Sequence, residues 1–132
     1  METAVEKLVA ISFAVIGLSH VVQPRAWAEF FIRFRQKGEA GSLQLGLLYL
    51  PVALLIVAFH NVWHGLAIIV TFIGWAQLVK SLVYLAWPRH GLRMLAFVSV
   101  ERPWQFIAGG IFSIAVSAVI FLSLSQSNAV MR

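Results

Sequence analysis

The residues of this sequence that could carry chemistry are polar side chains set inside long apolar stretches. Five of them would project toward the same side of a membrane: His20, Gln44, Gln77, Lys80 and Tyr84. Polar groups are costly within lipid, so those found there often serve binding or transport. Gln77, Lys80 and Tyr84 follow the i, i+3, i+7 spacing of one helical face. We expect this face to look into the protein and to bind a ligand or lipid.

Lys80 is the most singular of these residues. It is the only full charge well inside an apolar stretch, and we expect no acidic side chain within such a stretch to neutralise it. Its ammonium could extend to the nearby membrane surface, or meet Gln44, Gln77 and a helix-end carbonyl. It could also bind an anionic headgroup or solute. The sequence leaves these alternatives open.

Histidine is the second residue type that could act chemically, as a metal ligand or a proton carrier. His60 and His64 are four residues apart, so they would share a helical face if the following helix began early enough. Two histidines are only half of a metal site, and a polar turn capped by Asn61 is the preferred interpretation. We expect a structural role for His20, which would donate a hydrogen bond on the last turn of its helix.

Other chemistry is excluded by what the sequence lacks. Its 132 residues include no cysteine, which removes thiolate nucleophiles, disulfides and thiolate metal sites. It has no phosphate-binding loop, no nucleophile paired with a base and no trio of metal ligands. We therefore expect no catalytic residues, no cofactor and no metal beyond the weak histidine pair.

Long apolar helices must position these side chains. Hydrophobic residues make up 61% of the chain and charged residues only 11%, whereas soluble domains carry about a quarter charged residues. Four segments are long and apolar enough to cross a bilayer, at about 4–22, 42–59, 62–87 and 103–124. The sequence predicts a single all-α membrane domain over residues 1–132, in which neighbouring spans pack antiparallel as a four-helix bundle.

An amphipathic helix is predicted at about 24–37, between the first two spans. Its aromatic residues stand at i, i+3, i+4 and i+7 and form one stripe: Trp27, Phe30, Phe31 and Phe34. Such a helix lies in the headgroup plane, with the aromatic side chains as anchors. It would be either a membrane-anchored connector or a surface that senses lipid or docks a partner. Residues 88–102 show no clean period, which leaves their structure open.

The basic residues indicate an orientation. Seven of the ten Lys and Arg fall in the loops after the first and third spans: Arg25, Arg33, Arg35, Lys37, Arg89, Arg93 and Arg102. Because positively charged loops stay in the cytoplasm, we expect both chain ends outside. The net charge of +5 then favours contact with anionic lipid over binding of nucleic acid.

Small residues recur every four positions on the last span, at Gly109, Ser113 and Ser117. This stripe predicts close helix packing, against the protein's own helices or against a second copy.

Two spacings suggest an internal repeat. The Pro-Arg pairs at 24–25 and 88–89 lie 64 residues apart, as do Gly46 and Gly110. Two like-oriented units descended from one ancestor would give this spacing. Few other positions agree, which favours coincidence.

Short motifs are spread over residues 17–88: Gly17-Leu-Ser-His20, Pro24, Trp27, Phe30-Phe31, Phe59-His60-Asn61-Val-Trp63, Gly74-Trp75 and Lys80. They resemble small bacterial four-helix integral membrane proteins of uncharacterised function. The resemblance implies the four-helix architecture and a bacterial cytoplasmic membrane, and it implies no activity.

The function expected from these features is non-catalytic. We expect an accessory, scaffold or lipid-interacting membrane subunit, which could form a homo-oligomer or join a larger membrane complex. The alternative is a small oligomeric carrier or pore that holds a polar or anionic solute near Lys80.

Overall fold

The computed structural model describes residues 1–130, which fold entirely into helices and connecting turns. The helices are α1 (Glu2–Val22), α2 (Pro24–Gln36), α3 (Glu39–Phe59), α4 (Ile68–Ala86), α5 (Pro88–Leu95) and α6 (Trp104–Val130). Four of them, α1, α3, α4 and α6, are long and apolar enough to cross a membrane. The predictions of an all-helical protein and of four candidate spans are confirmed.

The helix boundaries differ most from the predicted ones at the end of α6, which runs to Val130, six residues past its predicted end, and at the start of α4. This helix begins at Ile68, six residues later than predicted, because the chain after α3 runs through an irregular segment that includes Gly65 at a φ of 59°. A positive φ suits glycine and ends regular helical geometry there. Residues 88–95, whose structure the sequence left open, form the short helix α5.

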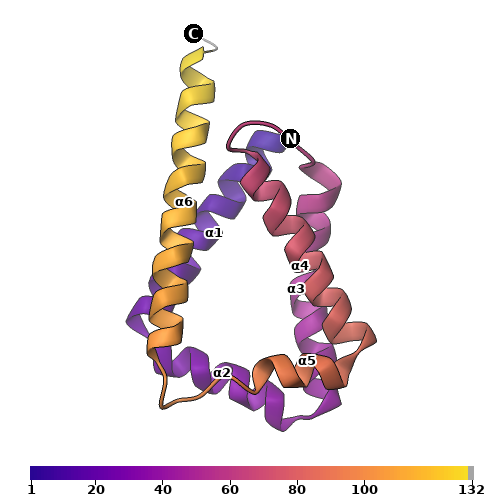
Figure 1. The fold of residues 1–132 in the computed structure, drawn as a ribbon. Coiled ribbons are helices and arrows are strands. Elements are labelled where there is room, and N and C mark those ends of the chain that lie inside the picture. Colours follow the sequence, from indigo (N-terminus) through magenta and orange to yellow (C-terminus); the bar gives the residue numbers. More distant parts are fainter. Residues whose placement is uncertain (131–132) are drawn as a thin grey trace.

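The four long helices form two separate legs instead of one compact bundle. In each leg two antiparallel helices pack along their length, α1 with α6 and α3 with α4. The legs meet near the N-terminus and diverge toward the other end, where α2 and α5 run between them (Figure 1). The prediction that sequence neighbours pack together therefore holds for α3 and α4 and is wrong for α1, which pairs with the last helix.

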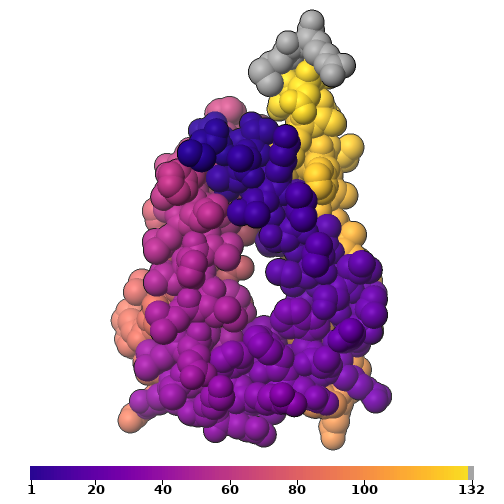
Figure 2. Space-filling model, turned by 180° about the vertical axis from the view of Figure 1, so that it is seen from behind, coloured from indigo at the N-terminus to yellow at the C-terminus, as the bar shows by residue number. Residues whose placement is uncertain are grey.

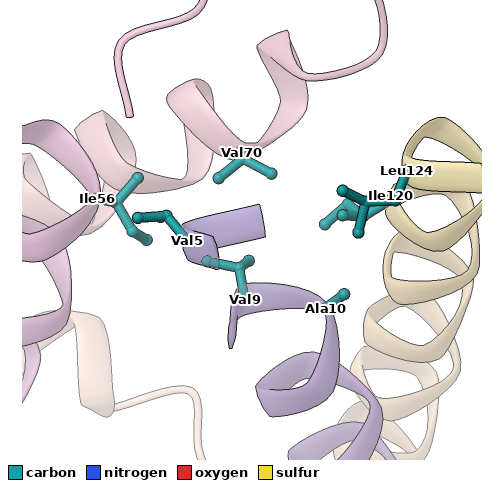
Figure 3. Packing of buried hydrophobic residues seen from close by; sticks show 7 residues of the cluster. All are labelled: Val5, Val9, Ala10, Ile56, Val70, Ile120 and Leu124. Carbon is teal, nitrogen blue, oxygen red and sulfur yellow. The ribbon is translucent and has the colours of Figure 1, made fainter. Parts of the chain in front are cut away.

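The legs meet at an apolar cluster that we call the apex cluster. It contains buried residues from all four long helices: Val5, Val9, Ala10, Ile56, Val70, Ile120 and Leu124. Figure 3 shows how these aliphatic side chains converge from α1, α3, α4 and α6. Moving such a side chain from water into the protein interior contributes roughly 1.5–3 kcal/mol to stability. Within lipid, tight packing between the helices stabilises the cluster instead.

The opposite end, which we call the base, is closed by α2 and α5. Each begins with a proline, Pro24 or Pro88, which suits the first turn of a helix. The guanidinium of Arg35 on α2 donates hydrogen bonds to the carbonyl oxygens of Leu95 and Val98, each at 3.0 Å. The Leu95 carbonyl ends α5 and the Val98 carbonyl lies just beyond it, so Arg35 ties the end of α5 and the following segment to α2.

The chain is built from two copies of one unit. Helices α1–α3 and α4–α6 each consist of a long helix, a proline-led helix at the base and a second long helix. The residues before the two prolines, Gln23 and Trp87, share a φ of −129° and have ψ values of 55° and 67°. The two units thus make the same sharp turn at the same place.

The contacts of the two units also agree at an interval of 64 residues. Gly46 lies against Tyr84 and Leu85, and Gly110 lies against His20 and Val21, which stand 64 residues before those two. Ile56 and Ile120, also 64 apart, are each 1% exposed in the apex cluster. The interpretation of the spacing as coincidence is therefore wrong. Two like-oriented units exchange helices, so that the last helix of each packs on the first helix of the other.

The close approach at Gly110 generates the first prediction. A Cβ atom at Gly110 would lie 2.5 Å from the carbonyl oxygen of Gly17, whereas a Cβ at Gly109 would meet nothing within 4 Å. Gly110→Ala should therefore force α1 and α6 apart and cost about 1–3 kcal/mol. Gly109→Ala should be neutral or stabilise by up to about 1 kcal/mol, since alanine favours helix.

Thermal unfolding of the two variants in the same detergent tests this difference. Equal unfolding temperatures for Gly110→Ala and Gly109→Ala would contradict the helix pairing described above.

Candidate functional site

The candidate site is a polar cluster on the leg formed by α3 and α4. The ammonium nitrogen of Lys80 lies 4.3 Å from the centre of the Tyr49 ring, which is a cation–π contact. Tyr49 in turn stacks on Tyr84, with the ring centres 6.1 Å apart. The cluster therefore joins two residues predicted from the sequence with Tyr49, which the sequence analysis did not select.

Gln77 adds a polar atom without a partner. Its side-chain oxygen Oε1 is buried and accepts no hydrogen bond within the part of the chain that the structure describes. An unsatisfied buried acceptor costs about 1–3 kcal/mol, so it marks either strain or a missing partner.

The cluster faces an opening between the two legs. On α4, Ile73 packs against the apex cluster and Tyr84 packs among apolar residues at the base. Gln77 and Lys80 lie between them on the same helical face. Figure 2 shows that this space passes through the molecule between the legs.

The other leg presents different residues to the opening. The positions 64 residues before Gln77 and Lys80 are Phe13 and Ile16, and the position 64 residues after Tyr49 is Ser113. Phe13 packs against the apex cluster, as Ile73 does on the other leg. The matching positions on the other leg are therefore mostly apolar, whereas the leg of α3 and α4 carries a cation beside an aromatic pair.

Two predicted members of the site lie elsewhere. Gln44 is exposed, and its side-chain oxygen accepts a hydrogen bond from Lys37 at 3.0 Å. His20 belongs to the other leg, where its ring stacks on Trp27 with the centres 4.1 Å apart. The Nδ1 atom of His20 lies 2.7 Å from the carbonyl oxygen of Ile16, as expected for a structural histidine. The structure therefore does not bring His20 or Gln44 to Lys80.

A second polar network lies near the apex. His60 is fully buried, with Nε2 at 3.1 Å from Glu6 and Nδ1 at 3.2 Å from the hydroxyl of Thr71. The hydroxyl of Thr71 donates to the carbonyl oxygen of Val62 at 2.7 Å and accepts from the Val62 amide at 3.0 Å. This network ties α1 to the other leg.

The hydrogen bonds of this network constrain where its protons lie. Because the Thr71 hydroxyl proton goes to the Val62 carbonyl, Nδ1 of His60 must donate to Thr71. One further proton lies between His60 and Glu6. The pair is either an imidazolium with a carboxylate or a neutral imidazole with a carboxylic acid. Both forms are neutral overall, which lowers the cost of burial.

One prediction about this region is wrong, and the condition set for the histidine pair is not met. Glu6 lies inside α1 and is only 9% exposed, so a candidate span does contain an acidic side chain. His60 and His64 do not share a helical face, because α4 begins at Ile68 and His64 is exposed. Within residues 1–130 no group of three or more histidine and acidic side chains is placed to hold a metal ion.

The predicted aromatic stripe packs largely on the protein itself. Phe31 and Phe34 contact the apolar cluster at the base, and the indole of Trp27 donates to the hydroxyl of Ser19 at 2.9 Å. Phe30 is the most exposed of the four. An anchoring role in lipid stays a prediction.

The residues of the predicted small-residue stripe do not all contact another helix. Ser117 is buried, and its hydroxyl donates to the carbonyl oxygen of Ala10 on α1 at 2.7 Å. Ser113 bonds within its own helix, to the carbonyl oxygen of Gly109 at 2.9 Å. Gly110, beside the predicted stripe, makes the closest approach to α1 in its place.

Three residues that matter were missed: Tyr49, Thr71 and Arg35. The sequence signal for Thr71 was available, because it is a hydroxyl in an apolar helix that follows a turn with two histidines. For Tyr49 and Arg35 the partners lie 31 and about 60 residues away, and no local pattern indicates them.

Neither a protein-family model, nor a curated protein, nor a solved structure matches this chain.

The apex network generates the second prediction. Thr71→Val keeps the shape of the side chain but leaves Nδ1 of His60 and the Val62 amide and carbonyl without their partner. Each unsatisfied buried group costs about 1–3 kcal/mol, so the unfolding temperature should fall clearly. Thr71→Ser retains the hydroxyl and should recover most of the loss. Equal destabilisation by valine and serine would show that packing, and not the hydroxyl, is what matters there.

Proposed function

We propose that this is a non-catalytic integral membrane protein that acts as an accessory, scaffold or lipid-interacting subunit in a bacterial cytoplasmic membrane. The supporting observation is the charge at the base. Seven basic residues lie on α2, on α5 and in the segments that follow them, against three acidic ones: Glu29, Glu39 and Glu101. Anionic lipid attracts such a surface by about 1 kcal/mol for each basic residue near it.

Several of these basic side chains are exposed and make no ion pair within the described residues: Arg25, Arg33, Arg93 and Arg102. Arg35 and Arg89 are engaged instead, with the end of α5 and with Glu39. The base therefore keeps a set of cations that headgroup phosphates can reach.

The same distribution supports an orientation. The base would face the cytoplasm, because basic segments are retained there during insertion, and the N-terminus and the end of α6 would lie outside. The helices α2 and α5 would then lie at the level of the headgroups.

A carrier or pore is less well supported. Transport of a polar solute needs a polar path across the membrane. Here the buried Ile56 stands along α3 between Tyr49 and His60, and it belongs to the apex cluster with Val9, Ala10 and Ile120. This apolar layer favours a protein that organises or holds lipid.

The third prediction tests the lipid-interacting role. In nanodiscs, phosphatidylglycerol should raise the unfolding temperature relative to phosphatidylcholine alone. The double variant Arg33→Glu, Arg93→Glu should lose most of this rise, because it places negative charge on the base. Lys7→Glu, at the other end of α1, serves as the matched control and should keep it. A rise that is identical in all three proteins would contradict the proposal.

The fourth prediction concerns orientation. The chain has no native cysteine, so single cysteines report one position each. Arg33→Cys at the base and Ser127→Cys near the end of α6 both replace exposed residues. An impermeant maleimide added to intact cells should label position 127 and not position 33. Labelling of both positions from outside would refute the orientation.

A further inference from the structure

The charge of Lys80 is not neutralised by the protein. The ion pairs among residues 1–130 are Glu6–His60 and Glu39–Arg89, and neither includes Lys80. The contact of its ammonium with the Tyr49 ring stabilises a cation without removing its charge. A lysine within a membrane normally pairs or reaches the surface.

Lys80 is half-buried, and its ammonium contacts the Tyr49 ring instead of an acidic side chain. Its ammonium lies over Tyr49, which is ten residues from the start of α3 at Glu39. At a rise of 1.5 Å per residue this is about 15 Å from the base end of the helix. The side chain therefore places a positive charge beside the opening.

Comparison with the first unit shows whether the fold itself requires the charge of Lys80. Ile16 occupies the matching position on α1, and Phe13 occupies the position that matches Gln77. The surrounding frame is the same in both units, since Gly46 and Gly110 make equivalent contacts. The fold therefore does not need a lysine or a glutamine at these positions.

The surroundings of Lys80 can hold an acyl chain. A groove of about 500 Å³ runs along α4 beside Lys80. Small-molecule sites have volumes of roughly 300–1,000 Å³. Apart from Lys80, the residues that line this groove are all apolar: Phe72, Trp75, Ala76, Val79, Val83 and Met94. The matching positions on α1 are the apolar residues Phe13 and Ile16.

Gln77 adds a hydrogen-bonding position next to the cation, on the same helical face. Its terminal amide can present either its oxygen or its nitrogen by rotation. The unpartnered position can therefore accept from a hydroxyl or donate to an anionic oxygen.

We propose that the opening between the legs binds one anionic amphiphile, with its carboxylate or phosphate on Lys80 and Gln77 and its acyl chain in the apolar groove and opening. The ligand would enter from the side, because the opening passes through the molecule between the legs (Figure 2). This inference rests on the proposed lipid-interacting function and assigns it a specific site.

The test uses the full chain, stripped of lipid in a zwitterionic detergent, and two probes: sodium oleate and dioleoylphosphatidylglycerol. Native mass spectrometry gives the number of bound molecules and their dissociation constants. We expect one saturable molecule per chain. Lys80→Ile, which copies Ile16 of the other unit, should weaken its binding at least tenfold. Lys80→Arg should retain most of the affinity, and the control Lys7→Ile should bind as the parent does.

The two probes distinguish the sources of the anion. Binding of oleate alone identifies a free fatty acid, and binding of phosphatidylglycerol alone identifies a phospholipid. Saturable binding of either one that depends on Lys80 supports the proposal. Binding of neither, or equal binding in Lys80→Ile and the parent, overturns it.

A loss of fold is separated from a loss of binding by the unfolding temperature and by a second variant, Lys80→Gln, which removes the charge but keeps a polar side chain. If Lys80→Ile is misfolded, the result for Lys80→Gln decides. The proposed function is tested independently through Arg33 and Arg93 at the base. An intact lipid response at the base with no Lys80-dependent binding overturns only the present inference. Lys80-dependent binding with no lipid response at the base overturns only the proposed attraction of anionic lipid to the base.

Discussion

Close approach of helix backbones at small residues decides which helices pair in this protein. Within lipid no hydrophobic effect draws helices together, so packing and interhelical hydrogen bonds select the partners. Gly110 brings α6 against Gly17 of α1, and Gly46 brings α3 against α4, where the hydroxyl of Ser81 donates to the Gly46 carbonyl at 2.8 Å. These contacts join the last helix of each repeat to the first helix of the other. Two legs are the result.

The two legs are connected at their ends by different kinds of interaction. At the apex, aliphatic side chains surround a buried hydrogen bond between Glu6 and His60, which is strong because the local dielectric is low. At the base, aromatic stacking and the hydrogen bonds from Arg35 to the end of α5 close the arch. The two legs, joined at both ends, leave an opening between them, and Lys80 beside it is less tightly packed than the residues of the apex cluster.

This looser packing explains why the two repeats differ beside the opening. At the buried positions where the helices pack, both units have residues of a similar kind, as at Ile56 and Ile120 in the apex cluster. Positions that face the opening have diverged, as Lys80 and Ile16 have. A tightly packed position tolerates little change in side-chain volume. A residue beside the opening is constrained instead by what it contacts there. The two units therefore differ most clearly at the position of Lys80.

Hydropathy and helical period are local properties, and they allowed the sequence by itself to determine four candidate spans, the helix that begins at Pro24 and the turn before α4. The partners of these elements were decided by the tertiary structure. Glu6 meets His60 across 54 residues, and α1 meets α6 across nearly the whole chain. The repeat was visible in the sequence only as a few shared residues, because the two units preserve burial and close contact more than residue identity. Burial and contact exist only once the helices are packed, so only the folded chain shows that one leg carries a cation and the other does not.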